Sequence, residues 1–218
     1  MEAESAVVIA TKNYVKKELL NAEGGHDWFH IERVYENAMT IAKNEAANLE
    51  VVSLAALLHD IADYKFNNGN EEIGPQKAEE FLTSIKVQDV VVEKVIAIVK
   101  NIGFKGGNQQ PDFESTELAI VQDADYLDAM GAIGIARAFN YGGFKNRKLY
   151  DPAIAPDLEM SKETYKKSTA PTINHFYEKL LLLKDKMQTK TGKKLAEKRH
   201  RFMENYLDQF FKEWEGKA

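Results

Sequence analysis

Apolar residues along this chain recur mostly three or four positions apart, the spacing of helices that bury one face. The strict alternation of apolar and polar residues that marks a half-exposed strand is hard to find. The pattern predicts helices over residues 6–20, 27–47, 51–62, 73–84, 87–100, 117–130, 133–139, 172–187 and 193–214. No internal repeat and no low-complexity segment divides the chain. We therefore expect an all-α fold in a single domain spanning residues 1–218.

Two of these segments allow a more specific structural prediction than the rest. Residues 51–58 are apolar nearly all round, which predicts a buried central helix. The valine-rich segment 87–100 resembles a strand, but its apolar positions fit a helical period better than alternation. Thr191 is the expected N-cap of the last helix. Glycine, proline and charged residues predict irregular structure at 67–70, 103–112 and 141–156.

The composition restricts the chemistry before any motif is considered. The 218 residues include no cysteine, which excludes disulfides, thiolate zinc sites, iron–sulfur clusters and a cysteine nucleophile. A transition-metal site must therefore consist of histidine and carboxylate ligands, and only five histidines are present. A net charge of −5 disfavours nucleic acid binding, although a local basic face at 193–201 keeps that class open. His200 lies on this stripe, which we expect to be exposed.

Three short motifs bring histidine and carboxylate together. His59 and Asp60 follow the most apolar run, where an ionised aspartate is rarely buried without a partner or a metal. His26 and His30 are four residues apart and share a face if the segment is helical. Asp125 lies in an acidic stretch among apolar residues. Taken singly, these motifs equally describe a helix end in solvent, a polar stripe and a surface acid. Together they favour a divalent cation with open positions for water.

The order of these motifs resembles the HD superfamily of metal-dependent phosphohydrolases. The resemblance rests on His30-x-x-Arg33-Val34-x-x-x-Ala38, on the run 54–60 ending in His59-Asp60, and on Ala124-Asp125-x-Leu127. Segments 131–137 and 175–181 are similar to the small single-domain bacterial branch. The resemblance implies a helical bundle with a metal-binding core at about 25–130 and additional C-terminal helices at about 131–218 that complete the pocket.

Carried over position by position, the resemblance implies four metal ligands: His30, His59, Asp60 and Asp125. It implies one divalent ion, and manganese, magnesium, iron, cobalt and nickel all suit imidazole with carboxylate. His26 precedes the position of the first ligand, so we assign it to a place beside a ligand or against a substrate phosphate.

Chemistry assigns the remaining roles. Asp63 lies four residues after His59, on the same helix face, and is the candidate acid/base group that orients the attacking water; a surface acid is the alternative. Asp128 is a candidate partner for a ligand histidine. The candidates for binding substrate phosphates are Arg33, Arg137, His175 and Lys179, and ordinary helix-surface charges are the alternative.

These residues lead us to expect an enzyme, a metal-dependent phosphohydrolase acting on a small phosphorylated substrate. The resemblance favours a nucleotide as substrate, because relatives of this branch include nucleotide pyrophosphohydrolases and nucleotidases. One specific version is cleavage of a nucleoside triphosphate to the monophosphate and pyrophosphate. A 5′-nucleotidase, a cyclic-nucleotide phosphodiesterase and a non-catalytic nucleotide-sensing domain remain alternatives. No apolar run approaches the ~20 residues that span a bilayer, and no secretory signal is evident. We therefore expect a cytoplasmic protein without a membrane partner, and leave a homodimer open.

Overall fold

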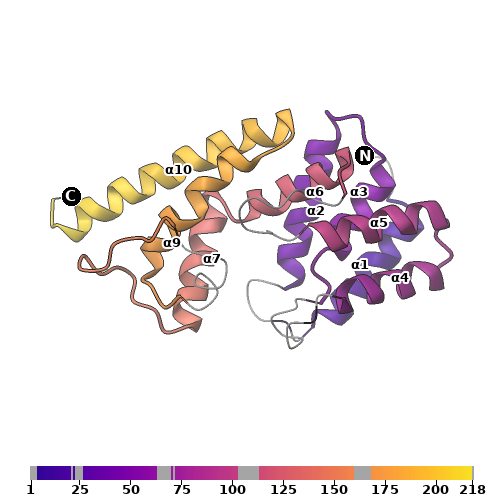
Figure 1. Ribbon diagram of the computed structural model, residues 1–218, viewed down its shortest axis with the longest axis horizontal. Coiled ribbons are helices and arrows are strands. Elements are labelled where there is room, and N and C mark those ends of the chain that lie inside the picture. Colours follow the sequence, from indigo (N-terminus) through magenta and orange to yellow (C-terminus); the bar gives the residue numbers. More distant parts are fainter. Residues whose placement is uncertain are drawn as a thin grey trace. The chain divides into compact units, whose positions relative to one another are not determined.

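The computed structural model describes residues 4–20, 22, 27–62, 70, 72–102, 113–159 and 168–217. Within these ranges every regular element is a helix and no strand occurs, which confirms the all-α prediction (Figure 1). The elements are α1 (Ala6–Glu18), α2 (Trp28–Ala42), α3 (Leu49–Leu58), α4 (Ile73–Ser84), α5 (Asp89–Asn101), α6 (Thr116–Asp128), α7 (Gly131–Phe144), α9 (Thr172–Glu178), the 3-10 helix η2 (Leu180–Lys186) and α10 (Lys190–Trp214).

The chain divides into two compact units, Met1–Asp125 and Tyr126–Ala218. The single domain expected from the sequence stays a prediction. In the first unit, α3 packs against α1, α2 and α5, and α4 packs on α5. Residues 51–58 of α3 are all buried, which confirms the predicted central helix. Because this helix has no polar face, the unit can form only with neighbours on all its sides.

Side-chain caps determine where the helices around the site begin. Asp27 is the N-cap of α2, and its carboxylate accepts a hydrogen bond from the backbone N–H of His30 at 3.0 Å. Asn48 is the N-cap of α3, and its side-chain oxygen accepts from the N–H groups of Glu50 and Val51. These bonds satisfy N–H groups that have no partner inside the helix.

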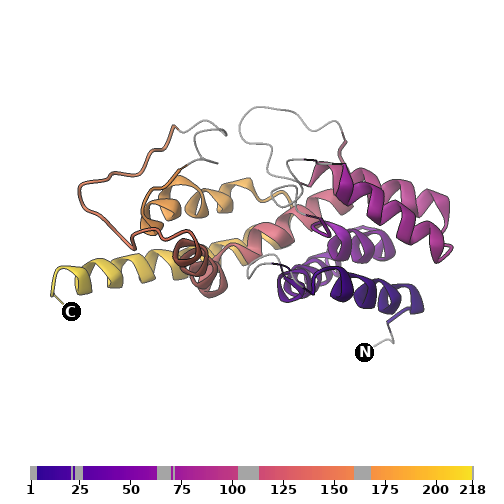
Figure 2. The ribbon, with the colours of Figure 1, turned by 90° about the horizontal axis from the view of Figure 1, so that it is seen from below.

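The second unit packs α7, α9, η2 and α10 together (Figure 2). The predicted helix over 172–187 is wrong in one respect, because the chain breaks at Lys179 (φ −144°, ψ −57°) and continues as η2. Phe176, Leu180 and Leu183 keep their helical spacing across the break and are all buried, so periodicity alone does not reveal it. The predicted N-cap is also wrong: Thr189 accepts from the N–H of Gly192 at 2.8 Å, and α10 starts at Lys190.

Helix α7 extends to Phe144, so the first residues of the predicted irregular segment 141–156 are helical. The glycine responsible for that expectation has a packing role. A Cβ atom on Gly142 would lie 2.1 Å from Oγ1 of Thr172, so only glycine lets α7 approach α9 this closely. The valine-rich segment is helix α5, as predicted. Among the described helices, none is long and apolar enough to cross a membrane.

Truncating the centre of α3 should destabilise the fold strongly. Leu57 is fully buried, and Leu57→Ala is expected to lower the free energy of unfolding by about 2–5 kcal/mol through the lost packing and the cavity. Leu49 lies on the same helix but is 49% exposed, so Leu49→Ala should cost less than about 1 kcal/mol. Urea unfolding followed by circular dichroism measures both. Equal effects would contradict the central role of α3.

Candidate metal centre

His30 lies in the first turn of α2, directly after the Asp27 cap. The hydrogen bond from its backbone to Asp27 fixes the start of the helix and therefore the origin of the imidazole side chain. The apolar positions that follow, including Ile31 and Val34, are fully buried in the first unit. The His30 side chain is itself only 2% exposed. A buried imidazole at this depth requires polar partners.

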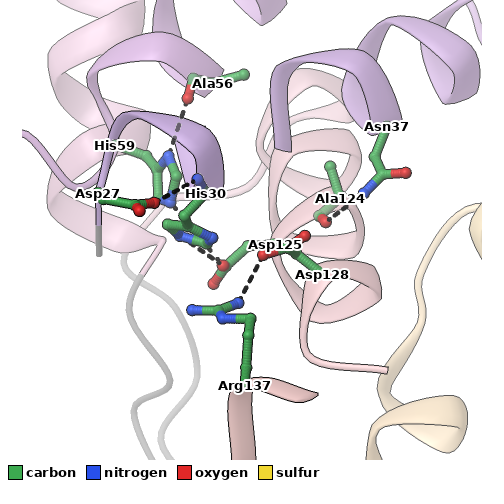
Figure 3. Close-up of polar contacts among 9 residues, drawn as sticks. All are labelled: Asp27, His30, Asn37, Ala56, His59, Ala124, Asp125, Asp128 and Arg137. Atoms are coloured by element: carbon green, nitrogen blue, oxygen red, sulfur yellow. Dashed lines mark hydrogen bonds and ion pairs between the residues drawn. The ribbon is translucent and has the colours of Figure 1, made fainter. Parts of the chain in front are cut away.

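His59 is the C-cap of α3, and its side chain is 4% exposed. Its Nδ1 lies 2.9 Å from the carbonyl oxygen of Ala56, one turn earlier (Figure 3). Because a carbonyl only accepts hydrogen bonds, Nδ1 donates to it, and Nε2 is the ring nitrogen that remains to face the cluster. This is the orientation that a metal-binding imidazole needs, and its N–H is held by a backbone group.

Two carboxylates complete the cluster. Donor atoms of His30, His59 and Asp60 all lie within 4.8 Å of one another. On α6, Asp125 places its Oδ1 3.6 Å from Nε2 of His30 and 3.9 Å from Nε2 of His59 (Figure 3). The two imidazole rings meet edge to face, with centroids 5.3 Å apart. The structure therefore brings the four predicted ligands together from α2, from the end of α3 and from α6.

The chemistry of this donor set fits a divalent cation. Nε2 of His59 and Oδ1 of Asp125 lie 3.9 Å apart, and both atoms can bind a cation placed between them. Octahedral ions with bonds of about 2.1 Å hold neighbouring ligands about 3.0 Å apart and opposite ligands about 4.2 Å apart. The observed separations lie close to this range. Their assignment as metal ligands stays a prediction.

The two predicted catalytic residues, His26 and Asp63, lie outside the described residues. Arg33 is on α2, one turn after His30, and is half-buried. The other candidate substrate-binding residues belong to the second unit: Arg137 on α7, His175 on α9, and Lys179 directly after α9.

Arg137 and Asp128 contact each other. An Nη1 atom of Arg137 lies 2.6 Å from Oδ2 of Asp128, whose side chain is 1% exposed (Figure 3). This pair gives Arg137 a structural role, because a buried carboxylate requires a compensating charge. The sequence-based roles, phosphate binding for Arg137 and pairing with a ligand histidine for Asp128, stay predictions.

His175 is neutral at physiological pH. Burial, together with the positive charges of Lys179 and Arg147, lowers the pKa of His175 from 6.5 to about 3. A neutral imidazole can donate one hydrogen bond to a phosphate oxygen but brings no positive charge. The positive charges that act on His175 are those of Lys179 and Arg147.

Sequence reasoning missed several polar residues around the site. Asp123, in the same acidic stretch as Asp125, is fully buried and was not among the candidate site residues. Asn37 of α2 donates a hydrogen bond to the Ala124 carbonyl; its place seven residues after His30, on the same face, was the available signal. The basic stripe is less exposed than expected, because Arg199 is half-buried and donates to the Leu127 carbonyl.

The sequence matches the HD domain family over residues 28–130. It is also 35% identical to YpgQ of Bacillus subtilis over 206 residues, covering 94% of this chain and 92% of YpgQ. The chain belongs to the HD superfamily. The matched HD segment contains His30, His59, Asp60 and Asp125, and its family assignment confirms the resemblance seen in the sequence.

Several solved structures share the fold over nearly the whole chain. A protein from Lactobacillus plantarum superposes with a TM-score of 0.83 and 38% identity, covering 98% of this chain and 99% of that one. An HD-superfamily hydrolase from Bacillus thuringiensis gives 0.77 and 42%, with 95% and 96% covered. YpgQ in complex with ADP gives 0.75 and 33%, with 95% and 94% covered. These neighbours support a hydrolase.

Removing the guanidinium of Arg137 should destabilise this HD protein. Arg137→Met leaves the buried Asp128 carboxylate without its closest positive charge, and we expect a loss of about 1–3 kcal/mol in the free energy of unfolding. Lys148 makes an exposed ion pair with Asp151 at 2.8 Å, so Lys148→Met is the control, with an expected loss below about 1 kcal/mol. Both losses are measured by urea unfolding. A loss no greater than that of the control would show that the Asp128 pair is not structural.

Proposed function

We propose that this HD protein is a divalent-metal-dependent phosphohydrolase that acts on a nucleotide. The observation that carries the proposal is the convergence of two buried imidazoles on one carboxylate oxygen, that of Asp125, with Asp60 in the same cluster. A nucleotide substrate is supported by the ADP complex of YpgQ, a relative whose chain matches this one almost end to end. A divalent cation, when bound, lowers the pKa of a water molecule and stabilises negative charge on phosphoryl oxygens.

The chain's own residues prepare the site for that chemistry. The Ala56 carbonyl holds the proton on Nδ1 of His59, so Nε2 needs no rearrangement before it binds a cation. The histidine side chains are almost fully buried, whereas the Asp125 side chain is 34% exposed. The cluster is therefore accessible from the side of Asp125, where a substrate phosphate can approach.

The finer assignments belong to the same proposal. Asp63 would orient the attacking water as the acid/base group, and His26 would act beside it. The residues that would bind and orient the substrate phosphates are Arg33, Arg137, His175 and Lys179. We propose hydrolysis of a nucleoside triphosphate to the monophosphate and pyrophosphate, because several positively charged side chains suit a polyphosphate.

A panel of nucleotides tests the reaction. The purified protein is incubated with nucleoside mono-, di- and triphosphates and cyclic nucleotides, each with Mn²⁺, Mg²⁺, Co²⁺, Ni²⁺ or Fe²⁺. Phosphate and pyrophosphate are measured separately. We expect pyrophosphate and a nucleoside monophosphate from at least one triphosphate. Release of phosphate alone would favour a nucleotidase. Binding of both metal and nucleotide without any turnover would favour a sensor and contradict the proposed enzyme.

Ligand substitutions test the metal centre independently of turnover. His59→Ala is expected to weaken Mn²⁺ binding more than about 100-fold, beyond the range for residues that only support a ligand. His26→Ala should lower activity while retaining the ion. His200 contacts Glu204 in the second unit, so His200→Ala is the matched control and should change neither. Isothermal titration with Mn²⁺ gives the affinities. Loss of the ion in His26→Ala would show that the ligand assignment is wrong.

A further inference from the structure

Helix α6, which carries Asp125, is hydrogen-bonded to its neighbours in the first unit by side chains. At its beginning, Glu117 accepts a hydrogen bond from the backbone N–H of Asn48, the N-cap of α3, at 2.9 Å. One turn later, the Gln122 amide donates to the carbonyl oxygens of Asn101 and Ile102 at the end of α5, at 3.2 and 3.4 Å. These bonds place the helix and satisfy backbone groups at the ends of α3 and α5.

A third hydrogen bond differs from these two in its position. Nδ2 of Asn37 donates to the carbonyl oxygen of Ala124 at 3.5 Å, and this carbonyl belongs to the peptide group that directly precedes Asp125. Asn37 also lies on α2, seven residues after His30, and a separation of two helical turns puts both residues on one face. Helix α2 thus contacts α6 twice, through His30 at the Asp125 side chain and through Asn37 at the backbone (Figure 3).

The rotation of α6 at this point determines where the Asp125 carboxylate lies. Side-chain ends lie about 5–6 Å from a helix axis, so a rotation of about 10° moves a carboxylate by about 1 Å. Constellations of binding groups tolerate about 0.5 Å. The apolar contacts of α6, such as Leu118 and Val121, are fully or nearly buried but not directional, and Ala124 has only a methyl group. The hydrogen bond to the Ala124 carbonyl is directional and acts on the peptide group next to Asp125, closer to that ligand than the bonds of Glu117 and Gln122.

We propose that Asn37 is a positioning residue for the candidate metal centre. Its side-chain amide holds the Ala124 carbonyl and thereby fixes the rotation of α6 that turns Asp125 toward His30 and His59. The inference rests on the proposed metal site, and it adds a residue that acts through the backbone of a ligand and does not touch the ion.

Mn²⁺ titration of variants of the full chain, without nucleotide, tests this role. Asn37→Leu keeps the volume and removes the donor, and we expect about 10-fold weaker Mn²⁺ binding. Asn37→Gln retains an amide donor on a longer arm and should recover part of the affinity. Mn²⁺ binding by Asn37→Leu within about twofold of the wild-type value would overturn the proposal.

Gln122→Leu is the matched control, because it removes another amide hydrogen bond from the same helix. We expect it to lower the urea midpoint at least as much as Asn37→Leu does, and to leave the Mn²⁺ affinity within about twofold of wild type. If Gln122→Leu weakens Mn²⁺ binding as much as Asn37→Leu, general loosening of α6 explains both effects and the positioning role is refuted.

A metal-free measurement separates this proposal from the proposed function. The distance from Nε2 of His30 to Oδ1 of Asp125, 3.6 Å here, is determined in crystals of metal-free wild type and of Asn37→Leu. We expect an increase of about 1 Å in the variant, the displacement produced by a rotation of about 10°. An unchanged distance overturns the proposal. If the wild-type protein binds no Mn²⁺, the metal centre fails, and this distance still decides whether Asn37 places Asp125.

Discussion

The first unit depends on the burial of residues 51–58 of α3. A helix with no polar face must be covered on all sides, and α1, α2 and α5 provide that cover. The first polar side chains after its apolar run, His59 and Asp60, consequently emerge among the surrounding helices. The histidine remains almost fully buried because the helix that delivers it is buried. The packing of the hydrophobic core thus determines where the site lies. The polar groups of the site are buried there and need hydrogen-bond partners or opposite charges.

The hydrogen bond made by the buried His59 side chain determines which of its ring nitrogens faces Asp125. The His59 proton is bound by the Ala56 carbonyl, so its second nitrogen faces the Asp125 carboxylate as an acceptor. Two acceptors 3.9 Å apart repel each other unless a proton or a cation lies near them. A cation bound between the two atoms would therefore be stabilised by both of them. This is a physical reason for metal affinity that does not depend on the family.

Local patterns in the sequence predicted the helices and the buried α3, because these depend on spacing within one element. The set of four candidate ligands came from the resemblance to the HD superfamily. Spacing could not predict the break at Lys179, since the apolar period continues through it, nor the packing role of Gly142, since glycine in isolation suggests a turn. Contacts between segments that are distant in the sequence also could not be predicted from local patterns. Asn37 and Ala124 are 87 residues apart in the sequence, and nothing near either residue indicates the other. Asp128 and Arg137 were both expected near the site, but their pairing with each other could not be predicted.

The end of α6 explains why Asp128 requires that partner. The last carbonyls of a helix have no partner within it, and the negative end of the helix dipole disfavours a carboxylate there. Asp128 is nevertheless buried at this end, so both its burial and its position raise its energy unless a cation is adjacent. Arg137 binds the carboxylate, and Arg199 donates to the Leu127 carbonyl. The alkyl chain of Arg199 comes within 3.1 Å of the position that a Cβ on Gly131 would occupy, at φ +68°. Gly131, Arg137, Arg199 and Asp128 thus act together where α6 ends. The two arginines bind the Asp128 carboxylate and the Leu127 carbonyl, and the glycine leaves room for the alkyl chain of Arg199.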